Sequence, residues 1–219
     1  MFGELILPAG VAEAAAVAWA NLGRPSRRLN GSERITIVNA ARAAIPRPLW
    51  DRNGGLNALR DASGDRGAVL VALAAIFATE ASLIDSNLVG ELSAEIGDAA
   101  YAETAALVAQ VITVDQFCIS MGIDVVPFPE PEAGEPSGER PDDMGDAGGH
   151  IQMTVPFRGP NVARSLSLAA EDHLRWRSLV LSMYSRDAFD EMVWSDRALT
   201  RPQVESLAAR TSSLNECFY

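Results

Sequence analysis

The chain has little of what several classes of protein require. Its 219 residues include only two cysteines, Cys118 and Cys217, which cannot form the disulfide framework of a small secreted protein and suit a reducing compartment. Lysine and arginine together number 18 against 29 acidic residues, so the formal net charge is -11. Nucleic acids and anionic membranes attract clustered basic side chains, and this balance therefore argues against both as partners.

Signals for export and for membrane insertion are also missing. No basic segment opens the chain, and Glu4 and Glu13 fall where a signal peptide keeps an uncharged apolar core. The most apolar run, residues 68–78, has about half the roughly 20 residues needed to cross a bilayer. We therefore predict a cytoplasmic protein without a membrane-spanning segment. His150 and His173 stand too far apart for the spacing of metal ligands, and we expect no metal or cofactor.

Most of the remaining sequence has helical composition and spacing. Gly23 and Pro25 end a first alanine-rich segment, Ser32 and Asp98 are candidate N-caps, and Thr200 precedes a first-turn proline, Pro202. The expected helices cover residues 12–22, 32–46, 66–84, 86–97, 98–123, 169–185 and the segment from 201 onwards. Convincing strand periodicity is absent, apart from a short candidate at 151–157. The fold class predicted is all-α.

One segment differs sharply in composition from its surroundings. Residues 126–149 are rich in proline, glycine and acidic residues and offer almost no side chain to bury. We interpret this segment as an extended or mobile loop. The chain is then expected to be a single all-α domain, residues 1–219, in which two packed helical parts, 30–125 and 150–219, flank the loop.

The C-terminal sequence TRPQVESLAARTSSLNECFY carries the main functional signal. Glu205 precedes Cys217 by twelve positions, and the segment resembles the signature of the alkylhydroperoxidase D and carboxymuconolactone decarboxylase superfamily. That signature has a Glu followed, after eleven residues, by Cys-x-x-Cys-x-x-x-His. Residues 97–123 and the proline-rich stretch from 127 resemble further segments of the superfamily, the latter from a peroxidase-related subgroup that includes selenoproteins.

This resemblance implies an alkylhydroperoxidase D-like helical fold, with a long central helical hairpin and association into a homo-oligomer. It also implies a thiol- or selenol-dependent peroxidase that acts on a hydroperoxide and a thiol reductant, with Cys217 and Glu205 as catalytic residues. The partner of Cys217 in a Cys-x-x-Cys motif falls at position 220, one residue past Tyr219. Because a UGA codon for selenocysteine is easily misread as a stop, we expect a truncated sequence. The chain as given should then be inactive or weakly active.

Helix geometry sets a condition on the role of Glu205. Twelve residues of unbroken helix would separate Glu205 from Cys217 by about 18 Å, too far for direct proton transfer. Ser213 or Asn215 could instead cap a new helix and place Cys217 in its first turn, where the helix dipole favours a thiolate. Alternatively, the helix is continuous and Glu205 is structural.

Other interpretations of the function and of individual residues remain open. Within the same superfamily, a decarboxylase-like lyase would not use cysteine redox chemistry, and a non-enzymatic oligomerisation module would bury an unreactive Cys217. Cys118 lies on an apolar helical face and is expected to be a buried small side chain. Glu103 and Asp115 align with Glu205 and Cys217 at equal spacing, as a duplicated helical unit would, but the default for Glu103 is a buried, hydrogen-bonded structural acid. We expect both histidines to lie at the surface.

Overall fold

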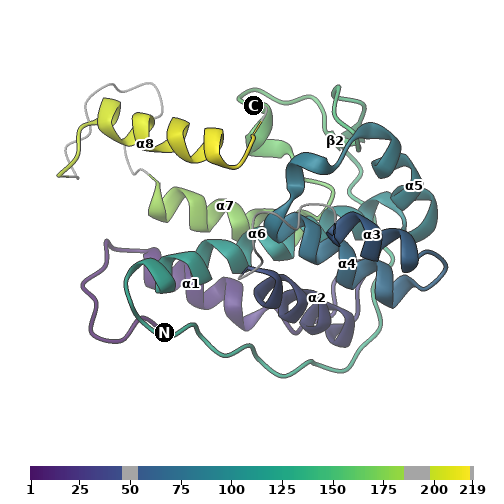
Figure 1. Cartoon of the computed structure of the whole chain (residues 1–219), viewed down its shortest axis with the longest axis horizontal. Coiled ribbons are helices and arrows are strands. Elements are labelled where there is room, and N and C mark those ends of the chain that lie inside the picture. The colour runs from purple at the N-terminus through teal and green to yellow at the C-terminus, as the bar shows by residue number, and fades with distance from the viewer. Residues whose placement is uncertain (46–53, 185–197, 218–219) are drawn as a thin grey trace.

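A single long helix, α6 (Asp98–Ser120), runs through the middle of the protein and contacts α2, α4, α5 and α7 (Figure 1). The structure is a computed structural model that describes residues 1–45, 54–184 and 198–217. The other helices are α1 (Val11–Ala20), α2 (Gly31–Ala44), α3 (Gly54–Asp61), α4 (Arg66–Thr79), α5 (Ser86–Ile96), α7 (Ala170–Met183) and α8 (Arg201–Leu214), with 3-10 turns η1 (Ala81–Leu83) and η2 (Asn161–Arg164). Among the described residues only β1 (Met144–Gly145) and β2 (Met153–Thr154) form a sheet, an antiparallel pair, so the all-α prediction is confirmed.

The helix ends follow local chemistry, with some differences from the sequence prediction. Asn30, not Ser32, caps α2: its side chain accepts the backbone N–H of Glu33, whose carboxylate accepts the N–H of Asn30 in return. Gly97 rather than Asp98 is the N-cap of α6. The predicted helix 66–84 ends earlier, because Glu80 leaves helical geometry and a separate 3-10 turn follows. Helix α3 was not predicted, since its first two residues, Gly54 and Gly55, are poor helix formers.

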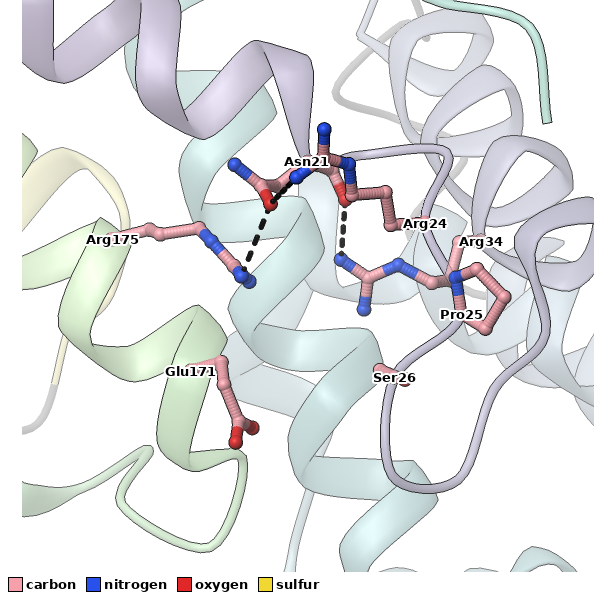
Figure 2. A pocket seen from close by; sticks show the side chains of 7 residues that line it. All are labelled: Asn21, Arg24, Pro25, Ser26, Arg34, Glu171 and Arg175. Carbon is pink, nitrogen blue, oxygen red and sulfur yellow. Dashed lines mark hydrogen bonds between the residues drawn. The ribbon is translucent and has the colours of Figure 1, made fainter. Parts of the chain in front are cut away.

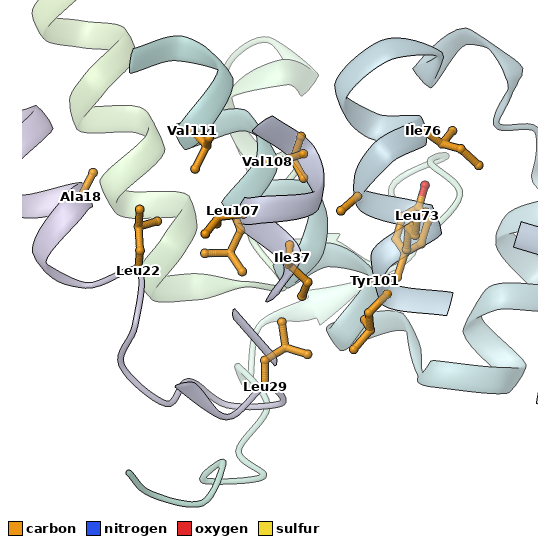
Figure 3. Packing of buried hydrophobic residues seen from close by; sticks show 14 of the residues in the cluster. Ala18, Leu22, Leu29, Ile37, Leu73, Ile76, Tyr101, Leu107, Val108 and Val111 are labelled. Carbon is orange, nitrogen blue, oxygen red and sulfur yellow. The ribbon is translucent and has the colours of Figure 1, made fainter. Parts of the chain in front are cut away.

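One apolar core joins helices from both halves of the described chain. Its side chains come from every helix from α1 to α7. Figure 3 shows part of the contact between α2, α4 and α6, including Ile37, Leu73, Tyr101, Leu107 and Val108. By length and composition α6 could span a bilayer, but most of it is buried against other helices. It also carries two buried acids, Glu103 and Asp115, whose partners lie on neighbouring elements.

The proline- and glycine-rich segment is extended, as its composition predicts, and it is bound to the body of the protein. Residues 123–140, which we call the strap, lie along the connection between α1 and α2. The backbone N–H groups of Glu132, Ser137 and Gly138 donate to the carbonyls of Gly23, Ser26 and Arg27 at 2.8, 3.1 and 2.9 Å. These main-chain bonds fix the strap in place although few of its side chains are buried.

Side chains of the core hold the first part of the strap. The indole N–H of Trp19 donates to the carbonyl of Pro127 at 2.8 Å, and the Arg42 guanidinium donates to the carbonyl of Val126 at 2.9 Å. Phe128 stacks on Trp19 with its ring centroid 5.4 Å away, and the guanidinium of Arg42 lies 3.6 Å from the centre of the Phe128 ring. The loop between α1 and α2 is therefore covered from outside by the strap.

Candidate functional site

Cys217 lies just beyond the C-terminal end of α8 and is exposed. Asn215 is the C-cap of this helix, and Glu216 adopts a left-handed conformation with φ of 53°, which is uncommon for a residue other than glycine. The backbone N–H of Cys217 donates to the carbonyl of Ser212 at 2.9 Å. This turn ties the backbone of Cys217 to the last turn of α8 and leaves the residue accessible to a solute.

Glu205 lies in the second turn of α8, and its carboxylate contacts Tyr184 and Arg201, not Cys217. Its carboxylate accepts a hydrogen bond from the Tyr184 hydroxyl at 3.1 Å and lies 3.4 Å from Nε of Arg201. Tyr184 is the C-cap of α7, so the first of these bonds connects α8 to the end of α7. Glu205 therefore anchors α8 in this structure.

The structure does not bring Glu205 and Cys217 together. Helix α8 is continuous to Leu214, so no new helix begins at Ser213 or Asn215, and the continuous alternative of the two geometries is the one observed. Nine residues of helix from Glu205 to Leu214 correspond to about 13 Å, and Cys217 lies three residues further along the chain. A direct proton transfer between the two side chains is excluded in this conformation.

Cys118 has the opposite environment to Cys217. It is fully buried in α6, and this burial raises the pKa of its thiol, with a further contribution from the nearby Asp115 carboxylate. The expectation of a buried small side chain is confirmed. Of the two thiols only Cys217 is accessible, which leaves it as the one candidate nucleophile among the cysteines.

Glu103 is a second group with unusual chemistry. It is 2% exposed and accepts hydrogen bonds from the Ser26 hydroxyl at 2.5 Å and from the backbone N–H of Arg28 at 3.1 Å. Burial raises the pKa of Glu103 to about 7, and the charge of Asp172 acts in the same direction, while Ser26 and Arg34 oppose the shift. The default interpretation of a buried, hydrogen-bonded acid is confirmed, and this acid exchanges its proton near neutral pH.

A charged cluster beside Glu103 links α2, α6 and α7. The Arg34 guanidinium makes two bonds to the carboxylate of Asp172, at 2.7 and 2.9 Å, and both side chains are almost fully buried. Arg175 donates to the same carboxylate at 2.9 Å, and the amide of Gln110 lies 3.3 Å from it. Although burial alone raises the pKa of Asp172, the two cations outweigh it and lower that pKa. Asp172 therefore remains ionised inside the protein.

A further buried pair holds α2 to α6. Asp115 is fully buried, and both of its oxygens accept hydrogen bonds from Arg42 at 2.7 and 2.8 Å. The position that aligns with Cys217 in the suspected duplication is thus a structural acid. The same guanidinium contacts the strap, so this pair connects the core to residues 126–128.

The two histidines differ from each other. His150 is exposed, as expected, but the expectation of a surface position for His173 is wrong. His173 is 6% exposed near the start of α7, beside Trp176, and burial lowers its pKa to about 4, with help from the charge of Arg177. His173 is therefore neutral at physiological pH. Within the described residues no three His, Cys, Asp or Glu side chains gather closely enough to hold a metal ion.

Sequence reasoning missed the cluster around Asp172, although the sequence contains one signal for it. All basic residues of the chain are arginines, and Arg34 occupies the same helical face as the apolar Ile37 and Val38. Arginine is the residue best suited to a buried ion pair, because its planar guanidinium binds a carboxylate through two parallel hydrogen bonds.

Comparison with protein-family models, with curated proteins and with solved structures finds no match for this chain.

Proposed function

We propose that this protein is a thiol- or selenol-dependent, peroxidase-like oxidoreductase that reduces hydroperoxides through Cys217. The observation that carries the proposal is the exposure of Cys217 at the end of α8, where a peroxide can reach the sulfur. The non-enzymatic alternative expected a buried Cys217, which differs from what is observed. The resemblance to the alkylhydroperoxidase D and carboxymuconolactone decarboxylase superfamily supplies the reaction type, and the mainly helical architecture is compatible with its fold.

The proposed reaction has three steps. The thiolate of Cys217 attacks one peroxide oxygen, the O–O bond breaks, and the products are a sulfenic acid and an alcohol once the alkoxide takes up a proton. A second thiol or selenol, which the resemblance assigns to position 220, then displaces the sulfenic hydroxyl as water and forms an S–S or S–Se bond. Two equivalents of an external thiol reduce this bond. In this scheme Glu205 positions α8 through Tyr184 and does not touch the thiol.

The first experiment measures whether the fold activates Cys217. The purified chain is treated with hydrogen peroxide and with cumene hydroperoxide, and sulfenic acid is trapped with dimedone and located by mass spectrometry. The resemblance implies that Cys217 is labelled at least tenfold faster than the same cysteine in a synthetic peptide of residues 211–219, although a position past the C-terminal end of α8 gives the thiolate no help from the helix dipole. Cys217→Ser should abolish the label and Cys118→Ala should leave it unchanged. Equal rates in protein and peptide would overturn the proposal.

A second measurement tests the redox pair that the resemblance implies. The coding DNA is read at codon 220 and the codons after it, and TGA followed by an open frame with a His four codons later would support the pair. Another residue at 220 would favour the decarboxylase-like lyase, and a different stop codon would favour the non-enzymatic oligomerisation module.

A homo-oligomer is the partner that fits α8. None of its described residues is buried, and Leu207 and Leu214 are 59% and 63% exposed. A helix with an apolar stripe and no buried side chain is typical of an interface helix. Sedimentation velocity of the wild type and of Leu207→Glu tests this: we expect an oligomer that the substitution dissociates, and a monomeric wild type would refute it.

A further inference from the structure

Three arginine side chains from different elements converge on Asn21, the C-cap of α1 (Figure 2). Arg24 in the following loop and Arg175 of α7 both donate to the side-chain oxygen of Asn21, at 3.2 and 3.3 Å. Arg34 of α2 donates to its backbone carbonyl at 3.2 Å. Because two guanidinium nitrogens share one acceptor oxygen, they lie at most about 6.5 Å apart. This convergence of cations occurs in a protein whose net charge is -11.

The charges in this region do not balance. Arg34 and Arg175 share the single carboxylate of Asp172. Two other acids act on Arg34: Glu171, which is paired with Arg27, and Glu103, whose raised pKa of about 7 leaves it only partly ionised at neutral pH, so an excess of positive charge remains. The partner of Arg24 is Glu132, but both side chains are 55% exposed, and such surface pairs contribute little. Carbonyls at the C-terminal end of α1 account for the placement of Arg34, which also donates to Leu22. Among the described residues, the bonds of Arg175 go to side chains instead, those of Asp172 and Asn21.

A cavity of about 190 Å³ lies at this point, between the end of α1, the start of α7 and the loop before α2. It is lined by seven residues: Asn21, Arg24, Pro25, Ser26, Arg34, Glu171 and Arg175. The one carboxylate among them, that of Glu171, is paired with Arg27 at 2.8 Å. The volume corresponds to about six water molecules. A guanidinium has five N–H donors, and within the described residues Arg175 uses two of them, for Asp172 and Asn21. The cavity therefore offers spare donors and an unmatched positive charge.

We propose that this cavity binds a small monocarboxylate, with Arg175 as its principal partner. A monoanion matches this excess of positive charge, and a planar carboxylate can accept two parallel hydrogen bonds from one guanidinium. The cavity of about 190 Å³ has room for a ligand of the size of pyruvate. The hydroxyl of Ser26 and the ring of Pro25 would contact the remainder of such a ligand. The proposal is independent of the chemistry at Cys217.

Isothermal titration calorimetry with sodium pyruvate, and with sodium sulfate as the control anion, at constant ionic strength set with sodium chloride, tests the site. We expect saturable binding of pyruvate to the wild-type chain at a stoichiometry of one. Arg175→Gln should weaken it at least tenfold, because it removes the charge-assisted bonds while Arg34 keeps its pair with Asp172. The matched control is Arg177→Gln on the same helix, a position that does not line the cavity, which should change affinity less than twofold.

A second variant keeps the test valid if Arg175→Gln folds poorly, as judged by its melting temperature. Arg24→Gln changes an exposed side chain at the edge of the cavity and should weaken pyruvate binding by two- to fivefold. Absence of saturable binding up to 50 mM pyruvate in the wild type would overturn the proposal. Equal loss in Arg175→Gln and Arg177→Gln, or equal affinity for sulfate and pyruvate, would show only general attraction of anions and would also overturn it.

Discussion

Replacing Glu103 by glutamine should change how the stability of this protein depends on pH. In the folded protein burial raises the pKa of Glu103 to about 7, from an ordinary value of 4.5. Well below pH 4.5 the carboxyl is protonated in both folded and unfolded states. As the pH rises towards 7 the unfolded chain loses the proton freely while the folded chain retains it, and stability falls. The full loss is about 3 kcal/mol, complete above pH 7.

Glutamine imitates the protonated acid in the observed network. Its carbonyl can accept the backbone N–H of Arg28, and one N–H can donate to the Ser26 oxygen, whose own hydroxyl then donates to the carbonyl of Leu29 3.1 Å away. The second amide N–H has no such partner and costs about 1 kcal/mol. We therefore expect Glu103→Gln to be slightly less stable than the wild type at pH 4.5 and about 2 kcal/mol more stable at pH 8.

The assay is urea unfolding of both proteins at intervals from pH 4.5 to 8, and the quantity of interest is their difference in free energy of unfolding. This difference between the two proteins is needed because the titration of His173 changes the stability with pH in the opposite direction to that of Glu103. Its folded pKa of about 4 lies below the ordinary 6.5, so its contribution grows as the pH rises through this window and masks that of Glu103 in the wild type alone. A difference that stays constant from pH 4.5 to 8 would refute the assignment of a raised pKa to Glu103.

Three further changes test other parts of the structure. The difference in free energy of unfolding between His173→Gln and the wild type should favour the variant more at pH 4.5 than at pH 7.5, measured by the same urea titration. An equal difference at both pH values would contradict a buried neutral imidazole. Asp172→Asn should cost about 3–5 kcal/mol in thermal or chemical unfolding, because it leaves Arg34 buried without its anion, and a loss below 1 kcal/mol would argue against the pair. Gly23→Ala places a Cβ 2.5 Å from the carbonyl oxygen of Glu130; we expect faster hydrogen exchange at the backbone N–H of Glu132, and unchanged exchange there would mean that the strap is not held at this point.

Local chemistry allowed most of the helices to be predicted. The segment beginning at Thr200 and Pro202 is helical from Arg201, because a first-turn proline and a capping residue act within a few residues of each other. For α2 the same reasoning predicted Ser32 as the N-cap, whereas the structure has Asn30 in this role. Serine and asparagine are both good N-caps, and only the side-chain geometry distinguishes them. It was harder to predict which residues of a helix are exposed. His173 has charged neighbours in the sequence but is buried in α7.

Contacts distant in sequence could not be predicted in this way. Arg34 and Asp172 are 138 residues apart, and no period or cap in either segment indicates the other. The fixed position of the strap could not be predicted either. The strap is bound by carbonyls of the α1–α2 loop, and the positions of these carbonyls depend on the tertiary fold. For the candidate nucleophile, sequence identified Cys217 and Glu205, but their separation followed only from the continuity of α8.

The way the strap is bound has a consequence for how its sequence can vary. Beyond Phe128 the strap is held by main-chain bonds and by two of its side chains, Glu132 and Arg140, which pair with Arg24 and Asp98. An exposed side chain such as Glu135 contributes little to its attachment. Gly134 and Gly138, in contrast, have φ of 150° and 74°, which restricts replacement by residues with a side chain. Outside Glu132, Arg140 and these two glycines, the strap should therefore tolerate changes in charge and polarity as long as its backbone keeps its shape. Related proteins are then expected to share its path with little sequence identity along it.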